Sequence, residues 1–248
     1  MKIIACYNNK GGVGKTALAV NLAHGLAAAG KRVLQCDLDP QGASGFYFRV
    51  KASKKLKDDR FFRDVERFTS AIRESDFQNL DILPANMTFR DFDVFLSRMK
   101  NRRSRLKKAL RSVDVDYDVI VLDCPPNIST LSENVFAAAD KVVVPVIPTT
   151  LAERTFDQLA GFFRENKIPK RKLVAVFSMV QATKKLHRDT MDNMRDRFGT
   201  RFLTTTIPFS ADVENMGVHR LPVATFAAQG KAGQAYADLT REVLALLD

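Results

Sequence analysis

A glycine-rich segment close to the N-terminus has the composition of a phosphate-binding loop. Residues 10–16 run Lys-Gly-Gly-Val-Gly-Lys-Thr, whereas the strict Gly-x-x-x-x-Gly-Lys-[Ser/Thr] pattern would require glycine where Asn9 stands. Glycines let backbone amides converge on phosphate oxygens without side-chain clashes. Lys15 can reach the β- and γ-phosphates, and the hydroxyl of Thr16 can coordinate Mg²⁺. The residues expected to hold a nucleotide are Lys10, Gly11, Gly12, Val13, Gly14, Lys15, Thr16 and Ala17.

Three aspartates follow apolar runs that have the character of buried strands. Asp37 ends the run 32–37, Asp39 comes two residues later, and Asp123 ends the run 117–123. A single aspartate after a strand most often makes a turn or caps a helix. The joint presence of all three instead favours a shared site, because ligands of open α/β sheets bind at the carboxyl ends of the strands.

Short apolar runs alternate along the chain with longer amphipathic ones. The expected strands are 2–7, 32–37, 80–84, 117–123, 141–147, 172–179 and 202–207. The expected helices are 16–29, 60–75, 88–112, 129–139, 151–165, 185–198 and 231–247. This alternation indicates a mostly parallel, twisted sheet with helices on both faces. No linker or repeat is visible, so we expect one α/β P-loop domain over residues 1–248, least regular at 47–79.

Composition argues against several classes of protein. Hydrophobic residues make up 46% of the 248 residues, which is enough for a sizeable core. Cys6, Cys36 and Cys124 are odd in number and widely spaced, so we expect buried thiols in a reducing cytosol rather than disulfides or metal ligands. No run approaches 18 apolar residues, and the opening apolar run is too short for a signal peptide.

Three motifs together resemble the ParA/MinD family of partition and positioning ATPases. Residues 10–16 are similar to the family's deviant Walker A motif, and Asp-Leu-Asp-Pro-Gln-Gly at 37–42 is similar to its second motif. Asp-Cys-Pro-Pro at 123–126 is similar to its Walker B and switch II segment. The sequence departs from the family at 43–44, where Ala-Ser replaces Asn-Ala, and at 127–128, where Asn-Ile replaces the start of Ser-Leu-Gly.

The resemblance implies a mechanism. Family members bind Mg-ATP and form a sandwich dimer, in which the first lysine of the loop, here Lys10, reaches the partner's phosphates. Asp39 would orient the attacking water, Asp123 would hold Mg²⁺ through water, and Pro208 is the candidate contact for adenine. The implied catalytic residues are Lys10, Lys15 and Asp39, and the implied metal ligands are Thr16, Asp39 and Asp123. Hydrolysis in the family is slow and is stimulated by a partner protein.

The formal net charge of +11 predicts attraction to a polyanion. In the resembled family, basic residues of the C-terminal half bind DNA without sequence choice. The expected DNA contacts are Lys184, Lys185, Arg188 and Arg220. Residues 100–112 hold seven Lys or Arg and no acid, and form either a solvated helix face or a further polyanion contact. Phosphate contacts of this kind weaken steeply with salt.

The leading hypothesis is a cytoplasmic, nucleoid-associated ATPase that dimerises with ATP. It would partition or position a cargo, such as a plasmid, a chromosome region or a carboxysome, with an adaptor protein that stimulates hydrolysis. No helix-turn-helix domain precedes the loop, which argues against binding of a specific operator.

Two other classes remain open at the level of sequence. A MinD-like membrane-associated ATPase would need a basic amphipathic helix, but residues 236–248 carry three acids against Arg241 alone, so we expect no membrane partner. A metabolic enzyme of the same fold, such as a nitrogenase-reductase-like protein or an ATP-dependent synthetase, is the third class. Its iron–sulfur form would need cysteines on exposed loops.

Overall fold

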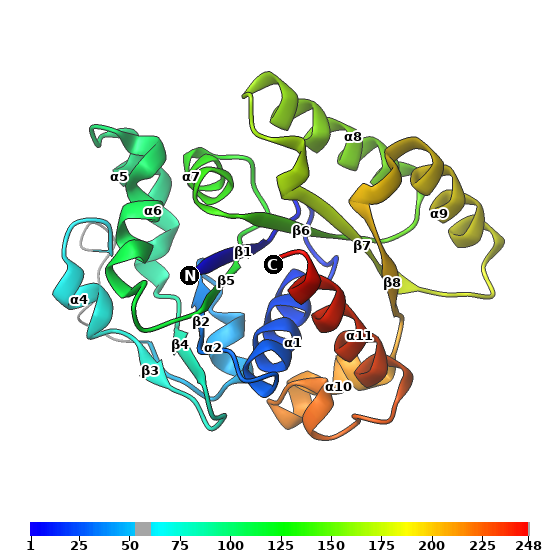
Figure 1. Cartoon of the computed structure of the whole chain (residues 1–248), viewed down its shortest axis with the longest axis horizontal. Coiled ribbons are helices and arrows are strands. Elements are labelled where there is room, and N and C mark those ends of the chain that lie inside the picture. Colours follow the sequence, from blue (N-terminus) through cyan, green and yellow to red (C-terminus); the bar gives the residue numbers. More distant parts are fainter. Residues whose placement is uncertain (53–60, 248) are drawn as a thin grey trace.

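The computed structural model describes residues 1–52 and 61–247 of the chain. In these residues, eight strands form one sheet in the order β3-β4-β2-β5-β1-β6-β7-β8 (Figure 1). The strands are β1 (Lys2–Cys6), β2 (Val33–Asp37), β3 (Arg73–Glu74), β4 (Leu80–Leu83), β5 (Val119–Asp123), β6 (Lys141–Val146), β7 (Leu173–Val180) and β8 (Phe202–Pro208). All neighbouring pairs are parallel except β3–β4. The predicted α/β class with a mostly parallel sheet is therefore confirmed.

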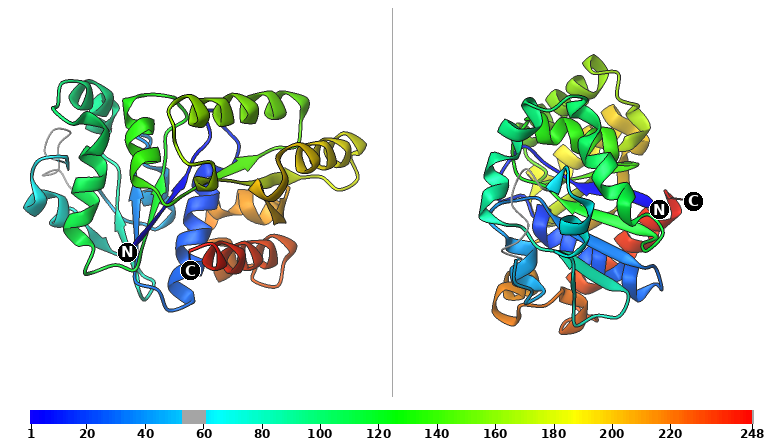
Figure 2. Two further views of the ribbon diagram at one scale, coloured as in Figure 1. Left: turned by 45° about the horizontal axis from the view of Figure 1, so that its top comes forward. Right: turned by 90° about the vertical axis from the view of Figure 1, so that its left-hand side faces the viewer.

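Helices cover both faces of the sheet (Figures 1 and 2). They are α1 (Lys15–Ala28), α2 (Ala43–Tyr47), α4 (Val65–Thr69), α5 (Phe92–Ser97), α6 (Arg105–Leu110), α7 (Thr130–Ala138), α8 (Thr150–Glu165), α9 (Lys185–Phe198), α10 (Ala211–His219) and α11 (Lys231–Ala245). Single 3-10 turns are η1 (Met87–Asp91), η2 (Arg102–Ser104), η3 (Arg111–Val113), η4 (Lys170–Lys172), η5 (Gly199–Arg201) and η6 (Val223–Thr225). None of the helices in the described residues is both long enough and apolar enough to cross a bilayer.

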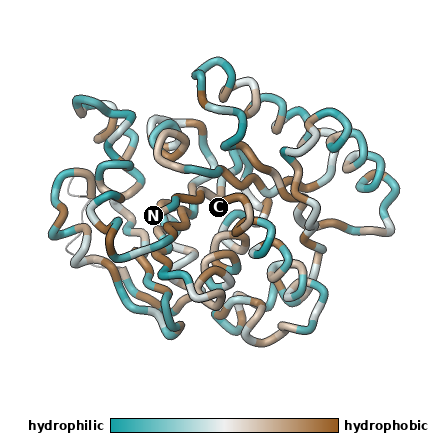
Figure 3. The backbone as a smooth tube through the Cα atoms, in the orientation of Figure 1, coloured by the Kyte–Doolittle hydropathy of each residue, from teal (hydrophilic) through white to brown (hydrophobic). Residues whose placement is uncertain are grey.

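Side chains along the central strands point alternately to the two faces of the sheet, and this divides the interior into two hydrophobic cores. In β1, Ile3 and Ala5 face the core under α5–α9, whereas Ile4 and Cys6 face the core under α1, α10 and α11. Successive strand side chains point to opposite faces, so a strand buried on both sides must be apolar throughout. Figure 3 shows these apolar strands through the middle of the molecule, with polar residues gathered on the outer helices.

The parallel strands end level with one another. Cys6 of β1 and Asp37 of β2 both pair with Asp123 of β5. We call the side on which these strands end the carboxyl edge of the sheet, and the side on which they begin the amino edge. The functional residues predicted from the sequence at strand ends therefore meet at the carboxyl edge.

The predicted strands are all present, but two of the predicted helices are wrong. The helix expected at 88–112 is interrupted between α5 and α6, where Asn101 has a φ of 54°, a left-handed value that a right-handed helix does not continue through. The helix expected at 60–75 begins outside the described residues, and the helix α4 within that range is confined to Val65–Thr69. Within that range, Arg73–Glu74 pairs with β4 instead, as the single antiparallel strand of the described sheet.

Two short helices were not predicted from the sequence. α2 follows the Asp-rich segment and ends at Tyr47, where the irregular stretch 47–79 begins, and α10 follows β8. The side chain of Ser210 caps α10 by accepting a hydrogen bond from the backbone amide of Asp212. Both helices follow the carboxyl ends of strands, so they border the candidate site.

Candidate functional site

The loop from β1 to α1 owes its shape to an asparagine and two glycines. The Asn8 amide nitrogen donates to the carbonyl of Pro145 in β6 at 2.8 Å, and its Oδ1 accepts from the backbone amide of Lys10 at 2.9 Å. Gly12 and Gly14 have φ values of 70° and 91°, in the left-handed region that side chains rarely adopt. A Cβ on Gly14 would also lie 3.2 Å from the Ser178 hydroxyl of β7. The loop is thereby fastened to β6 and packed against β7.

Lys15 is the first residue of α1 and is buried under this loop, with 7% of its surface exposed. Its ammonium donates to the carbonyl of Lys10 at 2.8 Å, the one hydrogen bond that it makes in the described part of the chain. Burial lowers the pKa of Lys15, and the nearby carboxylates of Asp123 and Asp39 act in the opposite direction. Two N–H groups of the ammonium are therefore free for a ligand, and an anionic ligand would offset the cost of burying its charge.

Two fully buried carboxylates face each other across β2 and β5. Asp37 accepts hydrogen bonds from the backbone amides of Asp39 at 3.1 Å and Ser44 at 3.0 Å. One oxygen of Asp123 accepts from the Ser44 hydroxyl at 2.8 Å, and its other oxygen, Oδ1, is buried with no hydrogen-bond partner among residues 1–52 and 61–247. Burial raises the pKa of both carboxyl groups, whereas the side chains of Ser44 and Thr16 act to lower that of Asp123. An unsatisfied buried carboxylate oxygen beside Thr16 is a position that a cation, directly or through water, would stabilise.

Ser44 connects the two carboxylates, and sequence reasoning did not identify it as a site residue. Its hydroxyl donates to Asp123 and accepts from the Gln35 amide at 2.7 Å, while its backbone amide binds Asp37. The only sequence signal was that position 44 departs from the family pattern. Asp39 lies at the mouth of this network, half-buried, with Oδ1 accepting from the backbone amide of Gln41 at 3.0 Å.

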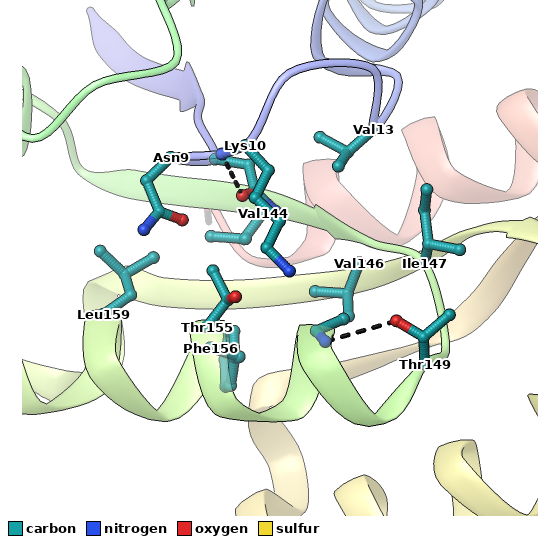
Figure 4. A pocket seen from close by; sticks show the side chains of 12 residues that line it. Asn9, Lys10, Val13, Val144, Val146, Ile147, Thr149, Thr155, Phe156 and Leu159 are labelled. Atoms are coloured by element: carbon teal, nitrogen blue, oxygen red, sulfur yellow. Dashed lines mark hydrogen bonds between the residues drawn. The ribbon is translucent and has the colours of Figure 1, made fainter.

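Lys10 points away from Lys15, toward α8. Its ammonium donates to the carbonyl of Leu151 at 3.2 Å, in the first turn of that helix. A cavity of about 100 Å³ lies between the loop, β6 and α8 (Figure 4). It is lined by Asn8, Asn9, Lys10, Val13, Val144, Val146, Ile147, Thr149, Ala152, Thr155, Phe156 and Leu159. The two lysines of the loop thus serve different regions: Lys15 faces the aspartates, and Lys10 lies beside the cavity.

The remaining predicted residues lie farther from the loop. Pro208 ends β8 and pairs with Val180, so the end of β7 stands between it and Gly14. Lys184 and Lys185 begin α9, and Arg188 binds the carbonyl of Ala182 at 2.7 Å.

Arg220 does not join the three cations of α9. It ends α10, donates to the carbonyl of Phe46 at 3.0 Å, and stacks 4.7 Å from the centre of the Phe46 ring. The structure therefore groups Lys184, Lys185 and Arg188 on one segment, and places Arg220 against α2.

Comparison with known proteins bears on the family of the whole chain. A family model described as an AAA domain matches residues 1–175. Sporulation initiation inhibitor protein Soj of Bacillus subtilis is 32% identical over 250 residues, which are 98% of each chain. Chromosome partitioning protein ParA of Myxococcus xanthus is 28% identical over 254 residues, which are 98% of this chain and 88% of that protein. The chain belongs to the ParA/MinD family of partition ATPases. The resemblance inferred from its motifs is confirmed.

This ParA/MinD-family chain is also similar in structure to a protein that is named for synthesis and not for partition. Cobyrinic acid a,c-diamide synthase from Mycobacterium smegmatis, solved with a bound ATP analog and magnesium, superposes with a TM-score of 0.82 at 28% identity. The match covers 98% of this chain and 94% of that one. The fold is thus shared by proteins named for partition and for synthesis.

Proposed function

We propose that this chain is a Mg-ATP-dependent ATPase that dimerises on its nucleotide, binds DNA without sequence choice, and partitions or positions a cargo. The observation that supports it best is the arrangement at the carboxyl edge. There the buried Lys15 ammonium and the unpartnered oxygen of Asp123 lie below a loop held open by left-handed glycines. Relatives named for chromosome partitioning support the cellular role.

The residues present fit Mg-ATP. The loop amides and the N-terminus of α1 suit phosphate oxygens, and the free N–H groups of Lys15 suit the β- and γ-phosphates. No cluster of three or more His, Cys, Asp or Glu in the described residues is arranged to hold a metal on its own. Mg²⁺ commonly takes only one or two protein oxygens, with water and phosphates completing its shell. Thr16, Asp39 and Asp123 are the proposed contacts, and Mg²⁺ would favour the ionised form of carboxyl groups that burial disfavours.

In this proposal, hydrolysis depends on where Asp39, Lys15 and the loop amides lie and on the charges that they carry. A water held by Asp39 would attack the terminal phosphate, while Lys15 and the loop amides would stabilise the charge that develops there. Lys10 is bound to the carbonyl of Leu151 within its own protomer. We assign it to the partner's nucleotide in the dimer, where its charge would help to make turnover depend on dimerisation.

DNA binding is assigned to the start of α9. Lys184, Lys185 and Arg188 follow the carboxyl end of β7, on the side of the molecule that dimerises in this proposal. Contacts with phosphates would carry affinity without sequence readout. The protein would then associate with the nucleoid as an ATP-bound dimer and dissociate after an adaptor stimulates hydrolysis.

The alternatives find less support. A MinD-like membrane helix would need the apolar face of the C-terminal segment, but in α11 the side chains of Tyr236, Leu239 and Val243 are buried against the sheet and α1. Cys6, Cys36 and Cys124 are all buried, which does not favour a bridging iron–sulfur cluster. A synthetase would need a carbon substrate to stimulate hydrolysis, and this gives it a separate test.

The test compares two variants with the wild-type chain by calorimetry, light scattering and gel shift. Lys15→Ala should lose Mg-ATP binding by at least about 100-fold, since two charge-assisted hydrogen bonds of about 1.5 kcal/mol each are removed. Asp39→Ala should bind ATP, dimerise and retain DNA, yet turn over at least about 100-fold more slowly. Equal DNA binding by wild-type protein with and without ATP would contradict the proposal. Hydrolysis that accelerates with a carboxylate substrate and ammonia, but not with DNA, would favour the synthetase.

A further inference from the structure

A second charged surface lies on the opposite side of the sheet from the nucleotide site. Its members are exposed or half-exposed cations near the amino ends of β6 and β7. They are Lys107 and Lys108 of α6, Arg111 of η3, and Lys170 and Arg171 of η4. We call these five residues the α6–η4 surface.

Packing against α7 brings the two parts of this surface together. The ammonium of Lys172 donates to the carbonyls of Phe136 at 3.2 Å and Ala137 at 3.4 Å, so η4 is fixed at the end of α7. Lys141, the first residue of β6, donates to the carbonyl of Arg171 at 3.2 Å. α6 packs on the same helix, through the Asn134 Oδ1 that accepts from the backbone amide of Leu106 at 3.3 Å. Segments far apart in sequence therefore share one face, beside α7 in Figure 1.

The cations crowd one another. Burial lowers the pKa of Lys172, and the charges of Lys107 and Arg171 lower it further, while Asp140 acts in the opposite direction. None of the five residues forms an ion pair with a carboxylate in the described chain. Exposed arginines elsewhere do, as in Arg32–Asp118 at 2.9 Å and Arg197–Asp157 at 3.0 Å. The five cations of the α6–η4 surface are thus open to an external anion.

The chemistry of the surface fits DNA better than a membrane. A membrane-binding surface combines cations with apolar side chains that enter the lipid. The large exposed hydrophobic residues of the described chain include none from α6, η3 or η4. Val115, which is exposed just beyond η3, is one apolar side chain against five cations, and unpaired cations suit the regularly spaced phosphates of a duplex.

The position of the surface decides how many duplexes a dimer can hold. The central strands have five to eight residues, so the amino and carboxyl edges are roughly 17–26 Å apart at about 3.3 Å per residue. In the dimer proposed above, the carboxyl edges face each other, so the two α6–η4 surfaces face outward. Resting on that dimer, we infer that each α6–η4 surface binds a duplex of its own, and that the ATP-bound protein bridges separate DNA segments.

The experiment is a two-duplex capture assay with the full-length chain. A biotinylated duplex on beads, protein and Mg-ATP are mixed with a second, fluorescent duplex, and the retained fluorescence is measured. The test variant carries Lys107→Gln, Lys108→Gln, Lys170→Gln and Arg171→Gln. The matched control carries four exposed cations changed elsewhere: Lys51→Gln, Arg90→Gln, Lys231→Gln and Arg241→Gln.

The wild type and the control should capture the second duplex, and the test variant should lose at least about 90% of that signal while still binding the first duplex and ATP. Its slope of log affinity against log salt should fall by about 0.9 for each DNA phosphate that the variant no longer neutralises. Equal capture by the test variant and the control overturns the inference, as does a test variant that dimerises but binds neither duplex. A wild type that holds one duplex and never a second also overturns it, yet leaves the proposed function standing.

Two further outcomes separate the sources of failure. A wild type that binds no DNA with ATP overturns the proposed function and the bridging inference together. Sedimentation with phosphatidylcholine–phosphatidylserine vesicles that depends on the same four residues would reassign the surface to membrane and overturn the DNA inference. Vesicle binding that is equal for the test variant and the control leaves the capture result decisive.

Discussion

The two edges of the sheet treat their carboxylates in opposite ways. At the carboxyl edge, Asp37 and Asp123 are fully buried, and burial raises the pKa of each. At the amino edge, a side-chain hydrogen bond from Arg32 lowers the pKa of the exposed Asp118 to about 2. Glu242 of α11, which contacts the edge strand β8, is also compensated: burial acts to raise its pKa, but backbone amides of Thr204 and Thr205 outweigh it, so that pKa is lowered.

This difference shows where the fold leaves charge uncompensated. The carboxyl edge concentrates desolvated acids beside one buried lysine, an arrangement that a cation and a triphosphate would complete. The amino edge satisfies Asp118 with an arginine, and leaves unpaired cations on the α6–η4 surface. Each edge therefore favours a ligand of its own, and both ligands carry phosphate.

The largest effect is expected from glycines at the two ends of α1. Gly14 and Gly30 both have left-handed φ values, of 91° and 84°, and open space surrounds only Gly30. Either change to alanine should destabilise the fold by about 1 kcal/mol. Gly14→Ala should in addition weaken Mg-ATP binding by at least about 100-fold, because misdirected loop amides lose two charge-assisted hydrogen bonds. Calorimetric titration of the two variants with Mg-ATP checks this. Equal Mg-ATP affinities would show that nucleotide binding does not depend on the loop at the carboxyl edge.

Ser44→Ala tests the network that joins the buried acids. The change removes two buried hydrogen bonds and leaves Asp123 and the Gln35 amide without their shared partner. We expect a loss of about 2 kcal/mol in the free energy of unfolding, measured in urea. Ser104→Ala, at an exposed hydroxyl, is the control and should change stability by less than about 0.5 kcal/mol. Equal losses would show that the network contributes nothing beyond an ordinary surface serine.

Asp123→Asn separates stability from function. It removes a buried charge but keeps an oxygen that can accept from Ser44, so the nucleotide-free protein should become more stable by about 1–2 kcal/mol. Stabilisation by Mg-ATP, measured as the rise in Tm on adding it, should disappear. A variant that is less stable without nucleotide would mean that the ionised carboxylate is already well compensated.

The smallest effect is a pH-dependent one between α11 and the edge strand β8. The lowered pKa of Glu242 means that its ionised form adds stability above the ordinary glutamate pKa, and that this contribution is lost as pH falls through the lowered value. Glu242→Gln should therefore reduce stability at pH 7, by less than about 1 kcal/mol, and make no difference near pH 2. Urea unfolding at both pH values checks this, with the exposed Glu165→Gln as control. A deficit that persists near pH 2 would assign the effect to packing instead.

Much of the fold was predictable because its signals are local. Apolar runs such as 117–123 can only be buried strands, and the order of strand, loop and helix around Lys15 follows from residues adjacent in sequence. The failures also have local causes: the helix expected at 88–112 is interrupted by Asn101, whose backbone is left-handed. Periodicity detects which face is apolar, and does not detect where the chain turns.

The sequence by itself determined the sheet, the phosphate loop and the set of aspartates, since strand periodicity and glycine spacing act over a few residues. Only the tertiary structure decided that Ser44 links Asp37 to Asp123, that Lys10 rests on Leu151, and that α6 and η4 share a basic surface. These contacts depend on how segments that are distant in sequence pack across the sheet. The spacing of side chains along the chain does not predict that packing.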